Sequence, residues 1–117
     1  MEMKYPLDQD ERKKALETAL GMGLYDGIEP YKVIADFMYT GMHPSVLANR
    51  AKSRVRVVDE HIEWIRPKKK GSAGYTRVLI HKELKSWIED FLLSDLPTYR
   101  EWYWGLCQKV GRKAGIP

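Results

Sequence analysis

Three consecutive lysines, Lys68, Lys69 and Lys70, are the residues of this sequence best placed to do chemistry on a phosphate. They lie within the run Arg66–Gly71, where proline and glycine predict a hairpin tip. A lysine held there could meet a phosphate as a point charge or donate a proton to a leaving oxygen. Lysine also keeps exposed turns soluble, so charge clustering alone leaves both interpretations open.

Basic charge is concentrated around that cluster. Residues 50–82 carry ten Lys or Arg against three Asp or Glu, a net charge of +7, whereas residues 1–49 carry −3 and residues 83–117 are neutral. Such a block usually faces a polyanion, and nucleic acid is the commonest one inside a cell; the alternative is a solvated basic face. The predicted contacts with the phosphates of double-stranded DNA come from Arg50, Lys52, Arg54, Arg56, Arg66, Lys69 and Lys70.

Other kinds of site find no support in the sequence. The nucleophile-elbow, metalloprotease, P-loop, dinucleotide-binding and CxxC patterns do not occur in it. One cysteine and three histidines do not predict a metal centre, and no cofactor is expected. Cys107 adjoins Leu106 in a helical pattern, where a buried, inert thiol is expected.

The composition is that of a globular protein. The chain has 117 residues, of which 44% are hydrophobic and 31% charged, and its mean hydropathy is −0.50. Its length predicts a single domain over 1–117. The longest run without a charged residue, Phe37–Asn49, is shorter than a membrane span, and Met1–Tyr5 lead into no signal-like apolar stretch. We expect a cytoplasmic, nucleoid-associated protein with no membrane partner.

The elements that must position the basic residues are indicated by a change in periodicity. Apolar residues three and four positions apart predict helices, and alternation of basic with β-branched residues predicts strands joined by short turns. The expected helices span 8–20, 30–39, 44–50, 82–93 and 98–113, and three strands lie within 54–80. The predicted fold class is α+β, with helices flanking a three-stranded antiparallel meander.

Local signals refine these expectations. Asp8 with Glu11, and Thr98 with Glu101, have the spacing of capping boxes at two helix starts. The first strand is expected to begin at Arg54. Three tryptophans fall on apolar stripes and are expected in the core: Trp64, Trp87 and Trp102.

Several segments, in order, resemble the tyrosine recombinases of the phage-integrase family. Tyr39–Leu47 resembles that family's "TGLRxSEL" segment, and Arg66–Lys68 its hairpin with a catalytic lysine. Ile80–Leu84 resembles the strand-to-helix step that follows, and Ala114–Pro117 the segment before the His-x-x-Arg box. Asp8–Glu11 resembles the start of the catalytic domain. The resemblance spans about residues 6–117 and implies the N-terminal portion of a recombinase catalytic domain, with an archaeal source suggested.

The resemblance also assigns roles and marks departures. It implies that Lys68 is the catalytic lysine, with Lys69 or Lys70 as rivals. His43 stands where the family has its first catalytic arginine, and Val46 where it has a glutamate. His43 is expected at the amino end of a short helix, where it meets a phosphate or simply caps the helix or packs beside Pro44.

The function expected from this resemblance is DNA binding by part of a site-specific recombinase. The sequence stops before the family's His-x-x-Arg box and nucleophilic tyrosine, so the chain alone is expected to be catalytically silent. Its partners would be double-stranded DNA and other recombinase protomers on that DNA. The alternative is a stand-alone basic DNA-binding accessory protein or a non-catalytic integrase remnant.

Overall fold

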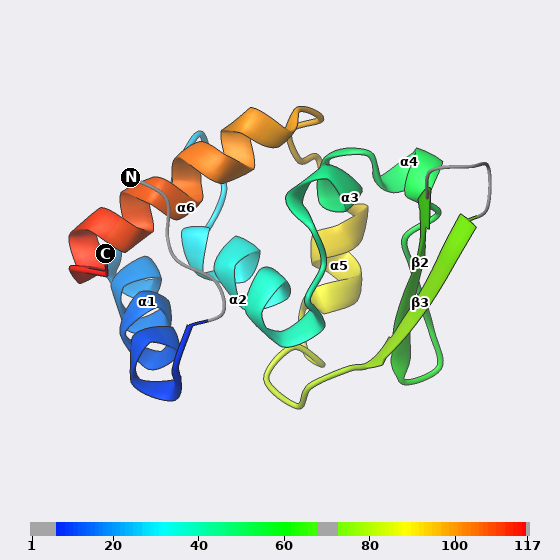
Figure 1. The fold of residues 1–117 in the computed structure, drawn as a ribbon, viewed down its shortest axis with the longest axis horizontal. Helices are drawn as coiled ribbons and strands as arrows, with labels where there is room; N and C mark the ends of the chain where they lie inside the picture. Colours follow the sequence, from blue (N-terminus) through cyan, green and yellow to red (C-terminus); the bar gives the residue numbers. More distant parts are fainter. Residues whose placement is uncertain (1–6, 68–72, 117) are drawn as a thin grey trace.

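The computed structural model describes residues 7–67 and 73–116. Figure 1 shows a β-sheet at one end of the molecule, helices α1 and α6 at the other, and α2, α3 and α5 between them. This confirms the α+β class. The elements in chain order are α1 (Gln9–Gly21), α2 (Pro30–Thr40), α3 (Pro44–Ala48), α4 (Arg50–Ser53), β1 (Arg56–Val58), β2 (His61–Pro67), β3 (Ala73–Leu79), α5 (Ile88–Leu93) and α6 (Arg100–Ala114).

The first two helices form as their local signals predict. Glu11 N donates to Asp8 Oδ1 at 2.8 Å and Asp8 N donates to Glu11 Oε1 at 3.1 Å, which completes the capping box of α1. Pro30 occupies the first turn of α2, where the missing amide hydrogen has no partner to lose. Gly41 ends α2 with a φ of 73°, a left-handed conformation that favours glycine.

The single helix expected over 44–50 is wrong, because the chain forms two short helices there. Asn49 has φ −116° and ψ 49°, which separates α3 from α4. Arg54 then ends α4 with a φ of 52°. That left-handed conformation cannot continue into a strand, so β1 begins at Arg56 and not at Arg54.

The three strands form the expected antiparallel meander, in the order β1-β2-β3. In the register, Val57 lies opposite Ile62 and Ile62 opposite Val78. Because side chains alternate between faces, Ile62 and Trp64 share one face of β2, and both are buried. The other face carries alternate residues, beginning with Arg56 in β1.

The helix expected over 82–93 is much shorter. Residues 82–87 form turns, with Leu84 N bonded to His81 O at 2.8 Å and Trp87 N to Leu84 O at 3.1 Å. Trp87 has a φ of −140°, and α-helix begins only at Ile88. Leu84 and Ile88 are nevertheless fully buried. The apolar spacing therefore indicated burial correctly, although turns rather than a helix deliver the first of these side chains.

Helix α6 begins two residues later than expected. Its N-cap is Tyr99, with no side-chain cap, so the predicted capping box of Thr98 and Glu101 is wrong. Arg100 Nε instead bonds Glu101 Oε2 at 3.1 Å, which engages the carboxylate outside the cap. Gly115 ends the helix with a φ of 71°.

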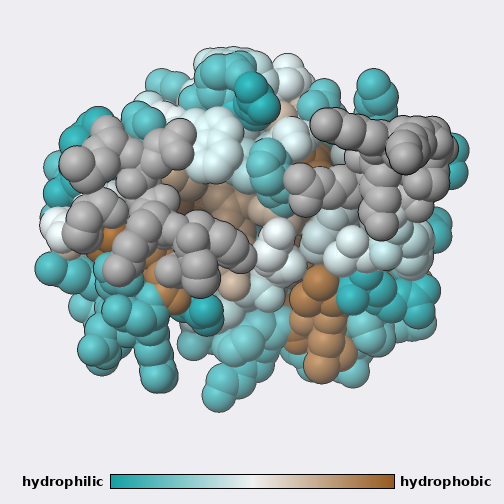
Figure 2. All heavy atoms as spheres, in the orientation of Figure 1, coloured by the Kyte–Doolittle hydropathy of each residue, from teal (hydrophilic) through white to brown (hydrophobic). Residues whose placement is uncertain are grey.

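The core lies between the helices and the inner face of the sheet. Trp64 and Trp102 are buried as expected, whereas Trp87 is only half-buried, against Tyr31 and Phe91. Figure 2 shows that hydrophilic side chains dominate the periphery of the face in view, with apolar atoms in separate small areas. In the described part of the chain, no helix is long and apolar enough to cross a membrane.

Candidate nucleic-acid interface

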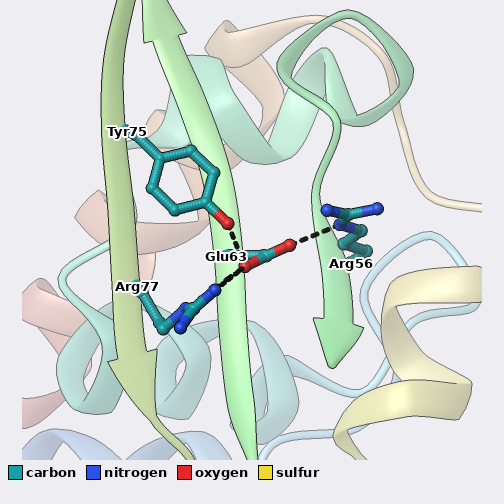
Figure 3. Close-up of polar contacts among 4 residues, drawn as sticks. All are labelled: Arg56, Glu63, Tyr75 and Arg77. Carbon is teal, nitrogen blue, oxygen red and sulfur yellow. Dashed lines mark hydrogen bonds and ion pairs between the residues drawn. The ribbon is translucent and has the colours of Figure 1, made fainter. Parts of the chain in front are cut away.

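A row of three charged residues crosses the outer face of the sheet. The register places Arg56 of β1 opposite Glu63 of β2, and Glu63 opposite Arg77 of β3. Side chains opposite each other share a face, and Figure 3 shows both guanidiniums and the hydroxyl of Tyr75 directed at the Glu63 carboxylate. We call Arg56, Glu63, Tyr75 and Arg77 the sheet cluster.

The contacts within the sheet cluster are close. Arg56 Nε donates to Glu63 Oε1 at 2.5 Å, and Arg77 donates to Oε2 from Nη2 at 3.1 Å and from Nε at 3.3 Å. The Tyr75 hydroxyl donates to the same Oε2. Glu63 is only 1% exposed beneath these groups, while the Arg56 and Arg77 side chains are 66% and 54% exposed. A buried carboxylate therefore anchors two cations that face solvent.

Hydrogen bonding keeps this carboxylate ionised. The hydrogen bond from Tyr75 is the main cause that lowers the pKa of Glu63 below its usual 4.5; burial opposes it, and hydrogen bonds from the two arginines add to it. The hydrogen bond to Glu63 in turn raises the pKa of Arg56. Two arginines and one glutamate give the sheet cluster a net charge of +1.

The sheet face around this cluster is open. Tyr75 and Leu79 project from β3 on the same side as Arg77, at alternate positions, and they are 56% and 62% exposed. Figure 1 shows helices α2, α3 and α5 on the other side of the sheet. A ligand could therefore approach the sheet cluster directly.

Helix α4 adds two exposed cations beside the sheet. Lys52 lies within α4 and Arg54 at its end, and both are exposed with no ion pair to another residue of the described ranges. Arg50, whose predicted contact with DNA stays a prediction, is half-buried. It donates from Nη1 to Leu47 O at 3.2 Å and from Nη2 to Ser94 O at 3.1 Å, which ties α3 to the segment after α5.

The remaining predicted cations lie at or beyond the limit of the described residues. Arg66 occupies β2 opposite Gly74 in the register. Lys68, Lys69 and Lys70 fall outside the described residues. The strands that lead toward them, ending at Pro67 and resuming at Ala73, agree with the expected hairpin.

His43 lies at the amino end of α3, as expected. Its Nδ1 accepts a hydrogen bond from Ser45 N at 3.1 Å and lies 2.7 Å from Ser45 Oγ. The ring also packs edge-to-face against Trp104, with centroids 6.0 Å apart. The helix-capping alternative is therefore realised. Contact with a phosphate stays a prediction.

The tyrosines with a perturbed pKa are not activated as nucleophiles. Burial is the main cause that raises the pKa of Tyr39 and of Tyr103 to about 12, and it also raises the pKa of Tyr31. Tyr39 and Tyr31 both donate to Glu83 Oε2, at 3.0 and 3.5 Å. These phenols act as neutral hydrogen-bond donors at physiological pH.

Three members of the sheet cluster, Glu63, Tyr75 and Arg77, were missed by the sequence reasoning. All three lie in segments correctly expected to be strands, so the alternation within those segments was available. What decided their position was the pairing of β3 with β2, which sets Arg77 against Glu63. A hairpin register counted outward from the tip would have found this pair.

Other regions of the described chain provide weaker candidates for a functional site than the sheet cluster. Among the described residues no three His, Cys, Asp or Glu side chains are grouped as a metal site would need. An open hollow of about 440 Å³ lies between the end of α1 and α6 and includes Lys109 and Lys113 in its lining. Figure 1 places these helices at the opposite end of the molecule from the sheet, so the hollow is separate from the sheet cluster.

Comparisons with known proteins identify no relative. No protein-family model matches the chain, and no curated protein or solved structure matches it significantly. The resemblance to tyrosine recombinases therefore rests on the sequence motifs alone.

Proposed function

We propose that this protein binds double-stranded DNA through the outer face of its sheet and the adjoining helix α4. The observation that carries the proposal is the sheet cluster, in which two exposed guanidiniums are held on opposite sides of one buried carboxylate. Arginine suits phosphate because its planar fork can donate two parallel hydrogen bonds. Guanidiniums that are already ordered lose less conformational entropy when a ligand binds.

Some N–H donors of Arg56 and Arg77 do not bond the Glu63 carboxylate. Arg56 uses only Nε on the carboxylate, and Arg77 uses Nε and Nη2. Neither terminal nitrogen of Arg56 and only one of Arg77 bonds the Glu63 carboxylate, although both guanidiniums also interact with the Tyr75 hydroxyl. With Lys52 and Arg54 nearby, about four cations can meet phosphates, a contact type that gives affinity without sequence preference.

We infer further that the chain is the N-terminal part of a tyrosine-recombinase catalytic domain, acting in DNA recombination or integration with other protomers at the nucleoid. The segments that resemble this family occur along the chain in the family's order, which supports this inference. In that role Lys68 would protonate the leaving oxygen and His43 would approach the scissile phosphate from the start of α3. The alternative is a stand-alone DNA-binding accessory protein or an integrase remnant. A native reading frame continuing into His-x-x-Arg and a tyrosine would favour the recombinase.

The DNA-binding proposal is tested by measuring affinity for a 20-base-pair duplex as a function of salt. With about four phosphates neutralised, log K should fall against log salt with a slope of about −4. Lys52→Ala and Arg77→Ala should each weaken binding and make the slope shallower by about 0.9.

Arg112→Ala is the charge-matched control, because Arg112 is exposed near the far end of α6. Its substitution should leave both the affinity and the slope unchanged. Absence of binding at 50 mM salt, or an equal effect of Arg112→Ala, would refute the proposal.

A further inference from the structure

We propose that Tyr75 and its two neighbouring arginines form a binding site for an unpaired nucleotide, whose base stacks on the Tyr75 ring while its phosphate binds Arg77 and Arg56. The proposal rests on the proposed function and deepens it, because it names the form of nucleic acid that this part of the sheet accepts. A single strand, or a duplex containing an unpaired base, is the predicted ligand.

The Tyr75 ring is both exposed and fixed. It lies on the open face of β3 and is 56% exposed, although burying an aromatic ring would be favourable. Its hydroxyl donates to Glu63, on the neighbouring strand. Figure 3 shows the ring extending from β3 toward β2 under this restraint. An exposed ring with an anchored hydroxyl can stack without first losing rotational freedom.

Cationic groups adjoin the ring and could meet the phosphate of a nucleotide stacked on it. The Arg77 guanidinium lies over one face of the Tyr75 ring, with its carbon 5.9 Å from the ring centroid. Arg56 approaches the same carboxylate from the opposite strand. This combination of an aromatic face with adjacent arginines is typical of surfaces that bind single strands, and the positive charge disfavours a purely apolar protein segment as the occupant.

A regular duplex cannot use the ring face. Its bases are stacked on one another and present only their edges in the grooves. An unpaired base offers its flat face, and stacking on an aromatic side chain tolerates any base identity. Duplex DNA would therefore contact the arginines alone, whereas an unpaired nucleotide would contact the ring as well.

The test compares fluorescence anisotropy titrations with three labelled oligonucleotides: a 12-residue oligothymidylate, a 20-base-pair duplex, and the same duplex with three unpaired thymines. Tyr75→Ala should weaken binding of the oligothymidylate and of the bulged duplex by about tenfold. It should leave the perfect duplex within twofold. Tyr75→Phe, which keeps the ring, should retain most of the affinity for all three.

Tyr99→Ala is the matched control, because Tyr99 is 55% exposed but lies before α6, outside the sheet. It should change none of the three affinities. Circular dichroism melting of each variant checks that the fold is retained. In the wild type, binding of oligothymidylate should also move the Tyr75 ring proton resonances upfield.

The possible failures can be told apart. If the perfect duplex binds but Tyr75→Ala has no effect on the unpaired ligands, stacking is refuted and the proposed DNA binding survives. Equal losses for Tyr75→Ala and Tyr75→Phe would assign the effect to the hydroxyl and its bond to Glu63, which also overturns stacking. If no oligonucleotide binds at low salt, both this site and the proposed function are wrong.

Discussion

Replacing Asp36 by asparagine should make the protein more stable at pH 8 but not at pH 4. Asp36 lies in α2 and is fully buried. Neither of its carboxylate oxygens has a hydrogen-bond partner in the described part of the chain. The close contact at this position, from Thr40 Oγ1 at 2.5 Å, involves the backbone oxygen of Asp36 instead. An ionised carboxylate in such a place is costly because nothing replaces its hydration.

The size of the effect follows from the pKa. Burial raises the pKa of Asp36 from its ordinary 3.8 to about 7. Each pKa unit between the unfolded and folded states corresponds to about 1.4 kcal/mol, so the full difference is about 4 kcal/mol. That is a large share of the 5–15 kcal/mol typical of a domain.

The sign is set by the direction of the shift. Well below pH 3.8 the carboxyl is protonated in both states and imposes no charge penalty, and at pH 4 the penalty is still below about 1 kcal/mol. Between pH 4 and pH 7 the unfolded chain releases the proton while the folded chain retains it, so stability falls as pH rises. Tyr103 of α6 is a titratable neighbour whose pKa is raised mainly by burial, to about 12, and in small part by the charge of Asp36. Tyr103 therefore does not titrate between pH 4 and pH 7.

The assay is urea unfolding of the wild type and Asp36→Asn at several pH values from 4 to 8. The amide has nearly the same shape but cannot ionise, so the two free energies of unfolding should agree near pH 4. By pH 8 the variant should be more stable by about 4 kcal/mol. Asp90→Asn, at an exposed position of α5, is the control and should track the wild type. Parallel curves for Asp36→Asn and wild type would refute the reasoning, since they would mean that the carboxylate is solvated or partnered.

Three further predictions concern other groups. Glu63→Gln should lower the melting temperature at pH 7, and the difference should narrow as pH falls below about 4.5, because the lowered pKa of Glu63 gives stability that is lost on protonation. Cys107 should react with a thiol reagent only after unfolding, because burial raises its pKa to about 12; rapid labelling of the native protein would contradict this. The chain should form no covalent adduct with a nicked suicide DNA substrate, since none of its seven tyrosines matches the nucleophile of the family that it resembles; a protein–DNA band on a denaturing gel would show otherwise.

The features predicted correctly from the sequence are those that depend on near neighbours in the chain. The Asp8–Glu11 capping box and the start of the second helix at residue 30 each involve residues within a single turn. Strand alternation also carried enough information to predict the meander, because adjacent strands joined by short turns have few other ways to pair.

The features predicted wrongly depend on tertiary contacts. Residues 82–87 have the apolar spacing of a helix, but they form turns. These turns bury Leu84 in the core, so its burial does not require a helix. The bonds of Arg50 to backbone oxygens were likewise not foreseen, because only the fold places Ser94 O within its reach; its contact with DNA stays a prediction. The site at Glu63 was missed rather than predicted wrongly, because it requires the registers of both strand pairs to be combined across the sheet.

The position of Arg50 shows why fewer cations could contact a phosphate than the sequence contains. Residues 50–82 have a net charge of +7, yet Arg50 is engaged by two backbone carbonyls. Arg56 and Arg77 share one carboxylate. If every one of the ten cations in that block met a phosphate, the salt slope would be about −9. A measured slope near −4 would instead match the arginines of the sheet cluster together with Lys52 and Arg54, and a much steeper slope would require contacts from Arg66 and the lysines beyond it.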